Sequence, residues 1–307
     1  MGFRTGLLLV LILATGCAAP LVLDDDNATV VIPRELGSEG HIIVRAMING
    51  RGPFRFALDT GASISVVYDS TRRRAGLELA EDENVGIQGM VSSGTFPLTT
   101  IAELRIGGES WTNARVASMP TEGGAFAKID GILGIDFLRR FAVGVSASDQ
   151  VVRLYPPQLV SERSYRGWTS IPMKPLQVGK GDATVFTISL HINDIEIPAM
   201  LDLGTGSNLM NWHTANTIQV SPRRARQGTE LAGAVETVPV VAELKVKQLR
   251  IGTVSWRNRI FLISDFPIFE ALGLEDRLAA ILGPGLFNER DFVIDFARER
   301  MLIGARR

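Results

Sequence analysis

An internal repeat of domain size is the feature that most constrains what this chain can fold into. Three short patterns occur twice in the same order, the second copy 143–149 residues after the first. One match would be weak, but three at nearly one spacing indicate a duplicated unit. A unit of that length is too long for a solenoid repeat and has the size of a domain. The matching segments are 104–113 with 249–258, 59–61 with 202–204, and 131–134 with 280–283.

The repeat predicts two lobes within the 307 residues. We place the first lobe at residues 29–157 and the second at residues 168–307. Between them, the stretch from Pro156 to Gly167 contains two prolines and several polar residues, which is typical of an exposed connection. We therefore place a linker at residues 158–167.

Each copy has the pattern of a β-rich domain. Residues 41–48 are apolar and β-branched, and Asn49-Gly50 is a hairpin signal. Residues 187–201 repeat this strand–turn–strand pattern in the second copy. Short helices are expected at 70–76, 135–140 and 209–217. The fold class is therefore predicted to be mainly β, with closed or barrel-like sheets and short helices.

Composition and motifs exclude several classes of function. Hydrophobic residues make up 46% of the chain, so a sizeable core is possible, and the net charge of −1 gives no basic surface for nucleic acid. The three histidines are scattered, with no metal-binding motif, and no serine-hydrolase elbow or dinucleotide loop is present. We therefore expect no metal, no cofactor and no nucleic-acid partner.

Residues 1–17 have the pattern of a signal peptide. Arg4 precedes a short apolar stretch, which is followed by small residues and Cys17, the one cysteine. Ala14-Thr15-Gly16-Cys17 is similar to a bacterial lipobox, in which the cysteine carries the lipid; Ala14 at the usual leucine position leaves ordinary secretory cleavage open. Residues 18–28 would form a tether. The expected location is the bacterial cell envelope, lipid-anchored through Cys17 and facing the periplasm, with the outer membrane favoured.

The segment 56–63, Phe-Ala-Leu-Asp-Thr-Gly-Ala-Ser, resembles the active-site loop of retropepsin-like aspartic proteases, the clan of pepsin and retroviral proteases. That family carries two apolar residues and a glycine downstream of the loop, and Ile132-Leu133-Gly134 fits this pattern. The resemblance covers nearly the whole chain after the signal peptide, counted over both copies. It implies two tandem retropepsin-like barrel lobes related by a pseudo-twofold axis, each supplying one catalytic aspartate, Asp59 and Asp202.

The chemistry of amide hydrolysis explains why the family needs these residue types. Two carboxyl groups that share one proton can activate a water and polarise the scissile carbonyl. A glycine after the Asp-Thr pair lets the backbone turn beside the carboxylate, and the threonine hydroxyl is expected to bond across to the opposite loop. The residues expected to support the two loops are Thr60, Gly61, Ala62, Ser63, Ile132, Leu133 and Gly134 in the first lobe, and Leu203, Gly204, Thr205, Ile281, Leu282 and Gly283 in the second.

The second loop departs from the family pattern at Leu203, which replaces the threonine. The cross-loop hydroxyl bond from that side is lost, which puts in doubt either catalytic efficiency or the pairing of the two copies. We expect the Thr205 hydroxyl to hydrogen-bond Asp202, whereas Ala62 has no hydroxyl to offer Asp59. Losing a donor to a charged carboxylate raises its pKa. The expected pH optimum is therefore less acidic than that of pepsin-like digestive enzymes.

Family members close a β-hairpin flap over the substrate. The expected flap spans residues 86–96, with Gly89 and Gly94 on either side of a tip that contains Met90 and Val91. Its counterpart in the second copy spans residues 228–238, with Gly233 near the tip.

These features predict an aspartic endopeptidase, a hydrolase that cleaves peptide bonds of envelope proteins or peptides with an Asp59/Asp202 pair. The expected partners are a peptide or protein substrate and, through Cys17, a membrane; a monomer with a pseudo-dimeric site is favoured. One alternative is a homodimeric protease that uses only Asp59, with the second lobe as scaffold. Another is a non-catalytic peptide-binding lipoprotein, since a protease cleft can retain peptide by strand addition after losing its chemistry.

Overall fold

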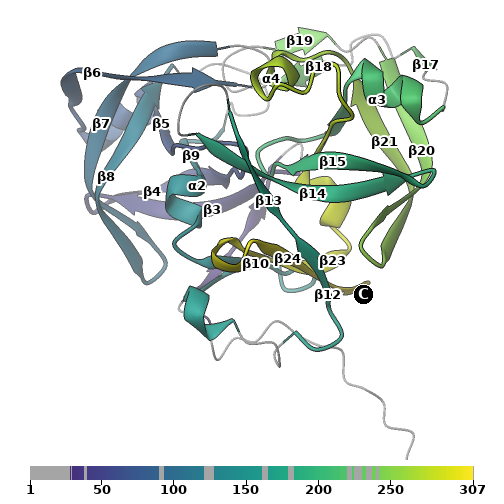
Figure 1. The fold of residues 1–307 in the computed structure, drawn as a ribbon. Helices are drawn as coiled ribbons and strands as arrows, with labels where there is room; N and C mark the ends of the chain where they lie inside the picture. Colours follow the sequence, from purple (N-terminus) through teal and green to yellow (C-terminus); the bar gives the residue numbers. More distant parts are fainter. Residues whose placement is uncertain are drawn as a thin grey trace, which may run out of the picture.

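The structure is a computed structural model, and the predicted signal peptide and its Cys17 lie outside the residues that it describes (Figure 1). Of the predicted tether it describes Ala28 alone. The described residues are 28, 30–37, 40–89, 93–120, 128–160, 165–178, 183–219, 223–224, 230–232, 237–239 and 242–306.

Two β-barrels lie side by side above a shared sheet, so the predicted mainly-β class with short helices is confirmed (Figure 1). In the first barrel the strand order is β2-β3-β4-β9-β5-β8-β7-β6, and an extra β3–β7 pairing closes six of these strands into a barrel. Its elements are β2 (Glu35–Leu36), β3 (Ile42–Ile48), β4 (Arg51–Leu58), β5 (Val66–Tyr68), α1 (Asp69–Ala75), β6 (Leu79–Gln88), β7 (Ser93–Ile106), β8 (Glu109–Met119), β9 (Gly131–Leu133) and α2 (Ile135–Leu138).

The second barrel repeats this arrangement strand for strand. Its order is β13-β14-β15-β22-β16-β21-β20-β17, closed by a β14–β20 pairing, with a separate β18–β19 hairpin. Its elements are β13 (Lys174–Gln177), β14 (Thr184–Ile192), β15 (Ile195–Leu201), β16 (Asn208–Met210), α3 (Trp212–Thr217), β17 (Arg223–Arg224), β18 (Glu230–Ala232), β19 (Thr237–Pro239), β20 (Ala242–Ile251), β21 (Val254–Ile263), α4 (Pro267–Ala271), β22 (Ala280–Leu282) and the 3₁₀ helix η2 (Pro284–Phe287).

A six-stranded sheet joins the two lobes beneath the barrels (Figure 1). Each lobe contributes three strands, and antiparallel pairing of β10 with β23 links the two sets. The matched positions of the strands from the two lobes give the molecule its pseudo-twofold symmetry. In order across the sheet, the strands are β1 (Val30–Pro33), β11 (Val151–Tyr155), β10 (Ala142–Val145), β23 (Arg290–Asp295), β24 (Arg300–Arg306) and β12 (Thr169–Pro172), with η1 (Pro157–Leu159) and η3 (Phe296–Arg298) nearby in the chain.

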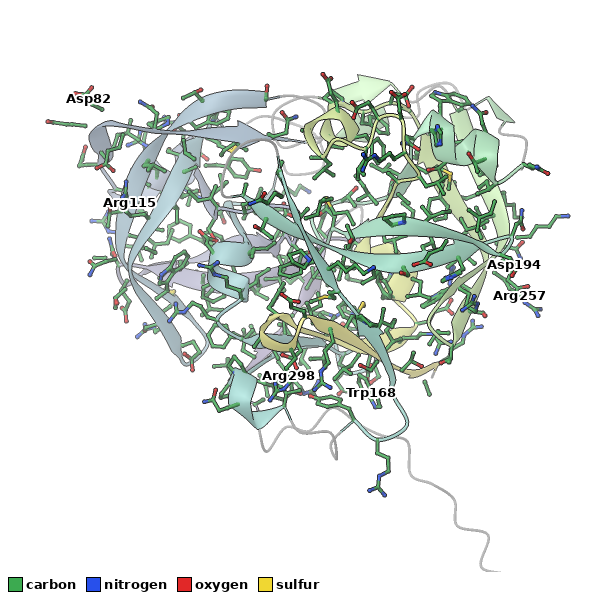
Figure 2. The ribbon with its side chains drawn as sticks, in the orientation of Figure 1. Asp82, Arg115, Trp168, Asp194, Arg257 and Arg298 are labelled. Carbon is green, nitrogen blue, oxygen red and sulfur yellow. The ribbon has the colours of Figure 1, made fainter. Side chains whose placement is uncertain are left out.

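One large apolar core runs through both lobes, and each barrel adds a smaller apolar cluster of its own. Apolar side chains alternate inward along the strands, as expected for barrels with a wet outer face. Many charged side chains lie outside: Figure 2 shows Asp82, Arg115, Asp194, Arg257 and Arg298 at the margin of the molecule. Burial of the core therefore holds the two lobes together as well as closing each barrel.

Two local features illustrate how the sequence sets these elements. Asn49 and Gly50 both have positive φ, 49° and 75°, as a tight turn between β3 and β4 requires. The helix expected at 209–217 starts later, at Trp212, because residues 208–210 pair as β16. Asn211 caps that helix, its Oδ1 accepting from the Thr214 N–H at 2.9 Å, which fixes the start.

Candidate active site

Each lobe presents its Asp loop at the end of a barrel strand. Asp59 follows β4 and Asp202 follows β15, and each of these strands pairs in parallel with the strand of the apolar-apolar-glycine motif. The backbone N–H of Asp59 donates to the carbonyl of Leu133 at 3.0 Å. In the same way the N–H of Asp202 donates to the carbonyl of Leu282 at 3.0 Å. The two motifs identified in the sequence therefore meet in space in both lobes.

The glycine that ends each motif allows the backbone to approach the Asp loop closely. A Cβ on Gly134 would lie 2.7 Å from the carbonyl oxygen of Ala62. A Cβ on Gly283 would lie 2.8 Å from the carbonyl oxygen of Thr205. No side chain fits at either separation, so only glycine permits this support of the loop.

The two aspartates face each other across the junction of the lobes. Each carboxyl group lies close enough to shift the pKa of the other. A Cβ on Gly61 would lie 2.7 Å from the Asp202 Cγ, and a Cβ on Gly204 would overlap the carboxyl group of Asp59. Each loop thus places its glycine against the aspartate of the other loop. One chain brings both carboxyl groups into a single site.

The pair is not symmetric in its environment. Asp59 Oδ1 accepts from the N–H groups of Gly61 at 2.8 Å and Ala62 at 3.0 Å. Asp202, 4% exposed, accepts from the N–H of Gly204 at 2.8 Å, whereas Asp59 retains partial exposure. Burial raises the pKa of Asp59, and the backbone donors and Asp202 oppose that rise. Burial and the charge of Asp59 together raise the pKa of Asp202 well above its ordinary value. The geometry therefore favours the proton on Asp202 and the negative charge on Asp59.

Thr60 makes the cross-loop bond that the sequence predicts. Its Oγ1 donates to the carbonyl of Leu201 at 2.7 Å and accepts from the N–H of Leu203 at 3.0 Å. The Leu203 side chain is 0% exposed and packs in the main core. In the second loop, the residue equivalent to Thr60 therefore contributes apolar packing and no hydrogen bond to the first loop.

The Thr205 hydroxyl is directed differently from our expectation. Its Oγ1 donates to the carbonyl of Ser207 at 3.3 Å and accepts from the N–H of Ser207 at 3.4 Å, rather than bonding to Asp202. Such a local turn competes for a threonine hydroxyl. Burial and the charge of Asp59 raise the pKa of Asp202, and the backbone N–H groups of Gly204 and Thr205 oppose that rise.

A cleft of about 300 Å³ lies over the two carboxyl groups and is walled by both lobes. Its first-lobe wall includes the supporting residues Ala62 and Ser63 and the apolar side chains Ile64, Met119 and Ile132. Its second-lobe wall includes Gly204 and Thr205 and, on the apolar side, Val178, Ala183, Met200 and Ile268. Among the described residues that line it, Asp59 and Asp202 are the only charged ones.

The hairpin expected to form the first flap lies at this cleft. β6 and β7 pair in the register Ile87–Gly94 and Gln88–Ser93, and residues 86–89 line the cleft, Gly89 included. Met90 and Val91 lie outside the described residues. In the second lobe, β18 and β19 form an antiparallel hairpin where the counterpart was expected, and Gly233 between them also lies outside the described residues.

Several residues at the site were not anticipated. His41 Nε2 donates to the carbonyl of Gly204 at 3.0 Å. Asp136, whose pKa burial raises, accepts from the N–H and Oγ of Ser65 at 2.9 and 2.7 Å, and Ser65 Oγ accepts from the Gly134 N–H at 3.0 Å. Tyr68 is buried, and burial and the charge of Asp59 raise its pKa. The aspartate two residues after Gly134 was a signal available in the sequence; the other residues reach the site only when the barrel closes.

Neither a metal site nor a membrane-spanning helix is found in the part of the chain that the structure describes. Within those residues no group of three or more His, Cys, Asp or Glu side chains could hold a metal ion. Within the same residues, no helix has the length and apolar character needed to cross a bilayer.

Comparison with known proteins supports the resemblance of the first lobe to aspartic proteases. Residues 44–140 match the family described as gag-polyprotein putative aspartyl protease, a range that contains both Asp59 and the Ile132-Leu133-Gly134 motif. A search of curated proteins finds no match. The first lobe is therefore similar to retropepsin-like aspartyl proteases over the matched range, and the two barrels are consistent with two tandem lobes of that kind.

Proposed function

We propose that the protein is an aspartic endopeptidase that hydrolyses peptide bonds with Asp59 and Asp202. The observation that carries this proposal is that the two Asp loops pack against each other and place both carboxyl groups in one cleft lined by both lobes. Two carboxyl groups that share one proton supply both a base and an acid, which amide hydrolysis without a covalent intermediate requires.

The asymmetry of the pair assigns the two roles. Asp59, the charged member, takes a proton from the attacking water as its oxygen bonds to the scissile carbonyl carbon. Asp202, the protonated member, gives its proton to the carbonyl oxygen, which produces a neutral gem-diol. Asp59 then passes its proton to the leaving nitrogen while Asp202 recovers one from a hydroxyl of the gem-diol. The C–N bond breaks, a carboxylic acid and an amine leave, and the pair returns to its starting state.

The cleft suits an extended peptide with apolar side chains on both sides of the scissile bond. Ile64, Met119 and Ile132 form an apolar wall on the first lobe, and Met200 and Ile268 form another on the second. Apolar walls shield the carboxyl pair from bulk water, which strengthens the electrostatic interactions between them. The backbone of the β6–β7 hairpin lies at the edge of this cleft, where it can cover a bound peptide.

We further propose that the enzyme acts in the bacterial envelope as a lipoprotein that faces the periplasm, on the strength of residues 1–17. Substitution Cys17→Ser should abolish metabolic labelling with a fatty-acid analogue and release the protein from the membrane fraction. Unchanged labelling would contradict the lipid anchor and leave the protease proposal intact.

The same geometry bears on the two alternative functions, a homodimeric protease and a non-catalytic peptide-binding protein. The homodimer that pairs two Asp59 loops would have to displace the Asp202 loop, which already contacts Gly61. Leu203 favours a non-catalytic peptide-binding protein, because the second loop lacks the hydroxyl of Thr60. The hydrogen bonds that Thr60 makes to both Leu201 and Leu203 favour the enzyme, since they hold the two loops in contact.

The deciding experiment compares the full chain, purified in detergent, with Asp59→Asn and Asp202→Asn on a mixed peptide library over a pH series. Each substitution should lower turnover about a thousandfold or more, because each removes one half of the shared-proton pair. Asp194→Asn, on the outer margin of the molecule, is the control and should leave turnover unchanged (Figure 2). Full activity in Asp202→Asn would favour the homodimer, and peptide binding without turnover in the parent would favour the binding protein.

A further inference from the structure

His41 lies just before β3 of the first lobe, and it is 1% exposed although its ring is polar. Its Nε2 lies 3.0 Å from the carbonyl oxygen of Gly204, which belongs to the Asp202 loop 163 residues further along the chain. A carbonyl oxygen can only accept, so Nε2 carries the proton and donates. A buried side chain from one lobe therefore holds the active-site loop of the other.

Gly204, whose carbonyl accepts the hydrogen bond from His41, is in contact with both carboxyl groups. The N–H of Gly204 donates to Asp202 Oδ1 at 2.8 Å, and its Cα lies against the carboxyl group of Asp59. Its carbonyl is the group that accepts from His41. That carbonyl belongs to the peptide unit that joins Gly204 to Thr205, and the N–H of this unit is, after that of Gly204, a backbone donor that lowers the pKa of Asp202. Any rotation of this unit would therefore move a donor of Asp202. The bond from His41 fixes that rotation.

The position of His41 is itself fixed by its own backbone. The N–H of Gly37 donates to the carbonyl of His41 at 2.9 Å. A Cβ on Gly37 would lie 3.2 Å from the Cβ of His41, so Gly37 packs closely on the histidine. The ring is therefore supported by Gly37 and by the start of a barrel strand, from which it makes a hydrogen bond across the lobes.

This bond occurs in a site that lacks one of its two expected cross-lobe links. Thr60 reaches the second loop through its hydroxyl, but Leu203 has no hydroxyl with which to reach the first. We propose that His41 is a positioning residue that, beside Thr60, supplies a second side-chain link from the first lobe to the Asp202 loop and so aligns Gly204 and Asp202 for catalysis, an inference that rests on the proposed protease function. It would provide a link between the loops that Leu203, which has no hydroxyl, cannot make.

The effect of His41 on the pKa of Asp59 is consistent with a position of its ring beside the two aspartates. Burial raises the pKa of Asp59, and among the influences that oppose this rise is the charge of His41. The ring therefore stands near enough to the first carboxyl group to act on it, as well as bonding to the loop of the second.

A double-mutant cycle tests the proposal on the full chain in detergent, with the peptide that the library shows to be cleaved fastest. His41→Phe keeps an aromatic ring without a donor, and His41→Gln keeps an N–H donor. Leu203→Thr restores a hydroxyl that, by the symmetry of the loops, faces the backbone of the first loop. His213→Gln, on the exposed face of α3, is the matched control.

We expect His41→Phe to lower kcat about tenfold with KM within about twofold, because a misaligned carboxyl pair affects the chemical step rather than peptide binding. His41→Gln should retain kcat within about threefold of the parent, because it preserves the donor. In the Leu203→Thr background the loss caused by His41→Phe should shrink to about threefold or less. Equal losses in both backgrounds, or a loss confined to KM, would overturn the proposal.

A second measurement does not depend on turnover and so separates this proposal from the proposed function. In a ¹H–¹⁵N spectrum of histidine-labelled parent protein, His41 should show a ring proton on Nε2 that exchanges slowly with water. The signal should be absent from His41→Phe and present in Asp59→Asn, which leaves the bond in place. Absence of that proton in the parent would overturn the role of His41 even in an active enzyme. A slow proton in a protein without Asp59-dependent turnover would reject the protease function alone.

Discussion

Thr60 and Leu203 occupy equivalent places in the two loops, yet one is polar and the other apolar. Thr60 bonds to the backbone at Leu201 and Leu203, whereas Leu203 is packed in the core. This difference, together with the two backbone donors on Asp59 and the deeper burial of Asp202, makes the two carboxyl groups inequivalent. A single-chain site can thus assign fixed roles to its two acids, which a symmetric dimer cannot do.

The pH dependence of turnover follows from this inequivalence. Asp59 must be charged, so activity is lost as pH falls through its pKa, which lies above the ordinary 3.8. Asp202 must be protonated, so activity is lost as pH rises through its pKa, which lies well above 3.8. Both limbs of the profile should therefore lie above the ordinary carboxyl value. A pH–rate profile measured on the library peptide checks this, and a maximum below about pH 3 would contradict it.

The free energy of unfolding should depend on pH through the buried carboxyl group of Asp202. The folded-state pKa of Asp202 is raised, so its contribution to the free energy of unfolding is fully present below the unfolded-state pKa and is lost as pH rises through the folded value. Asp202→Asn removes this dependence on pH, because an amide does not titrate in either state. It should raise Tm by roughly a few degrees near neutral pH, a gain that disappears in acid where the carboxyl group is protonated in both states.

Thermal unfolding followed by circular dichroism measures the change, with Asp194→Asn on the outer margin as the control (Figure 2). A lower Tm for Asp202→Asn near neutral pH would mean that the ionised carboxylate stabilises the fold, against the direction argued from its burial.

The glycines of the loops should tolerate no side chain. A Cβ on Gly204 would overlap the carboxyl group of Asp59, so Gly204→Ala must push the two loops apart. We expect kcat to fall about a hundredfold, the order of loss that follows a displacement of about 1 Å at a catalytic group. Gly285→Ala in η2, whose nearest contact would be 3.9 Å away, is the matched control and should stay active. Normal kcat in Gly204→Ala would mean that the loops are less tightly apposed.

The sequence predicts site residues that belong to a repeated motif, and it misses residues that come together only in the folded protein. The Asp loops and the Ile-Leu-Gly segments could be found because each recurs in both copies. Val178 and His41 could not, because an apolar residue after β13 and a lone histidine before β3 carry no local signal. Val178 reaches the cleft, and His41 reaches the Asp202 loop, only when the barrels close and the lobes meet. The Thr205 hydroxyl was misassigned because a local turn with Ser207 competes for it.

At the scale of elements, the β6–β7 hairpin forms one edge of the cleft, and its inner face should determine how peptide is held. Ile87 lines the cleft, whereas Glu83 on the same strand is exposed and pairs with Arg115. Ile87→Ala should lower kcat/KM by roughly tenfold, the order expected for removing apolar contact with substrate. Steady-state kinetics on the library peptide measure this, and Glu83→Ala should match the parent. Equal effects from both substitutions would argue against a flap.

At the scale of the whole molecule, the shared sheet makes the two lobes one unit. β10 pairs with β23 from Ala142–Asp295 to Val145–Phe292, so both lobes contribute to a single hydrogen-bonded ladder under the site. The main core also contains residues from both halves of the chain. Duplication alone would allow two independent barrels; the sheet and the core are what place the two Asp loops face to face.

A site complete within one chain predicts how activity responds to mixing and dilution. Asp59→Asn and Asp202→Asn are each expected to be inactive, and combining equal amounts should restore nothing, because each molecule still lacks one half of its own pair. Specific activity of the parent should stay constant on dilution. A site shared between chains would behave differently: the mixture would regain part of the parental rate, and dilution would lower activity as dimers dissociate. Recovery on mixing would therefore mean that Asp59 of one chain works with Asp202 of another, in spite of the contact between Gly61 and Asp202 within a chain.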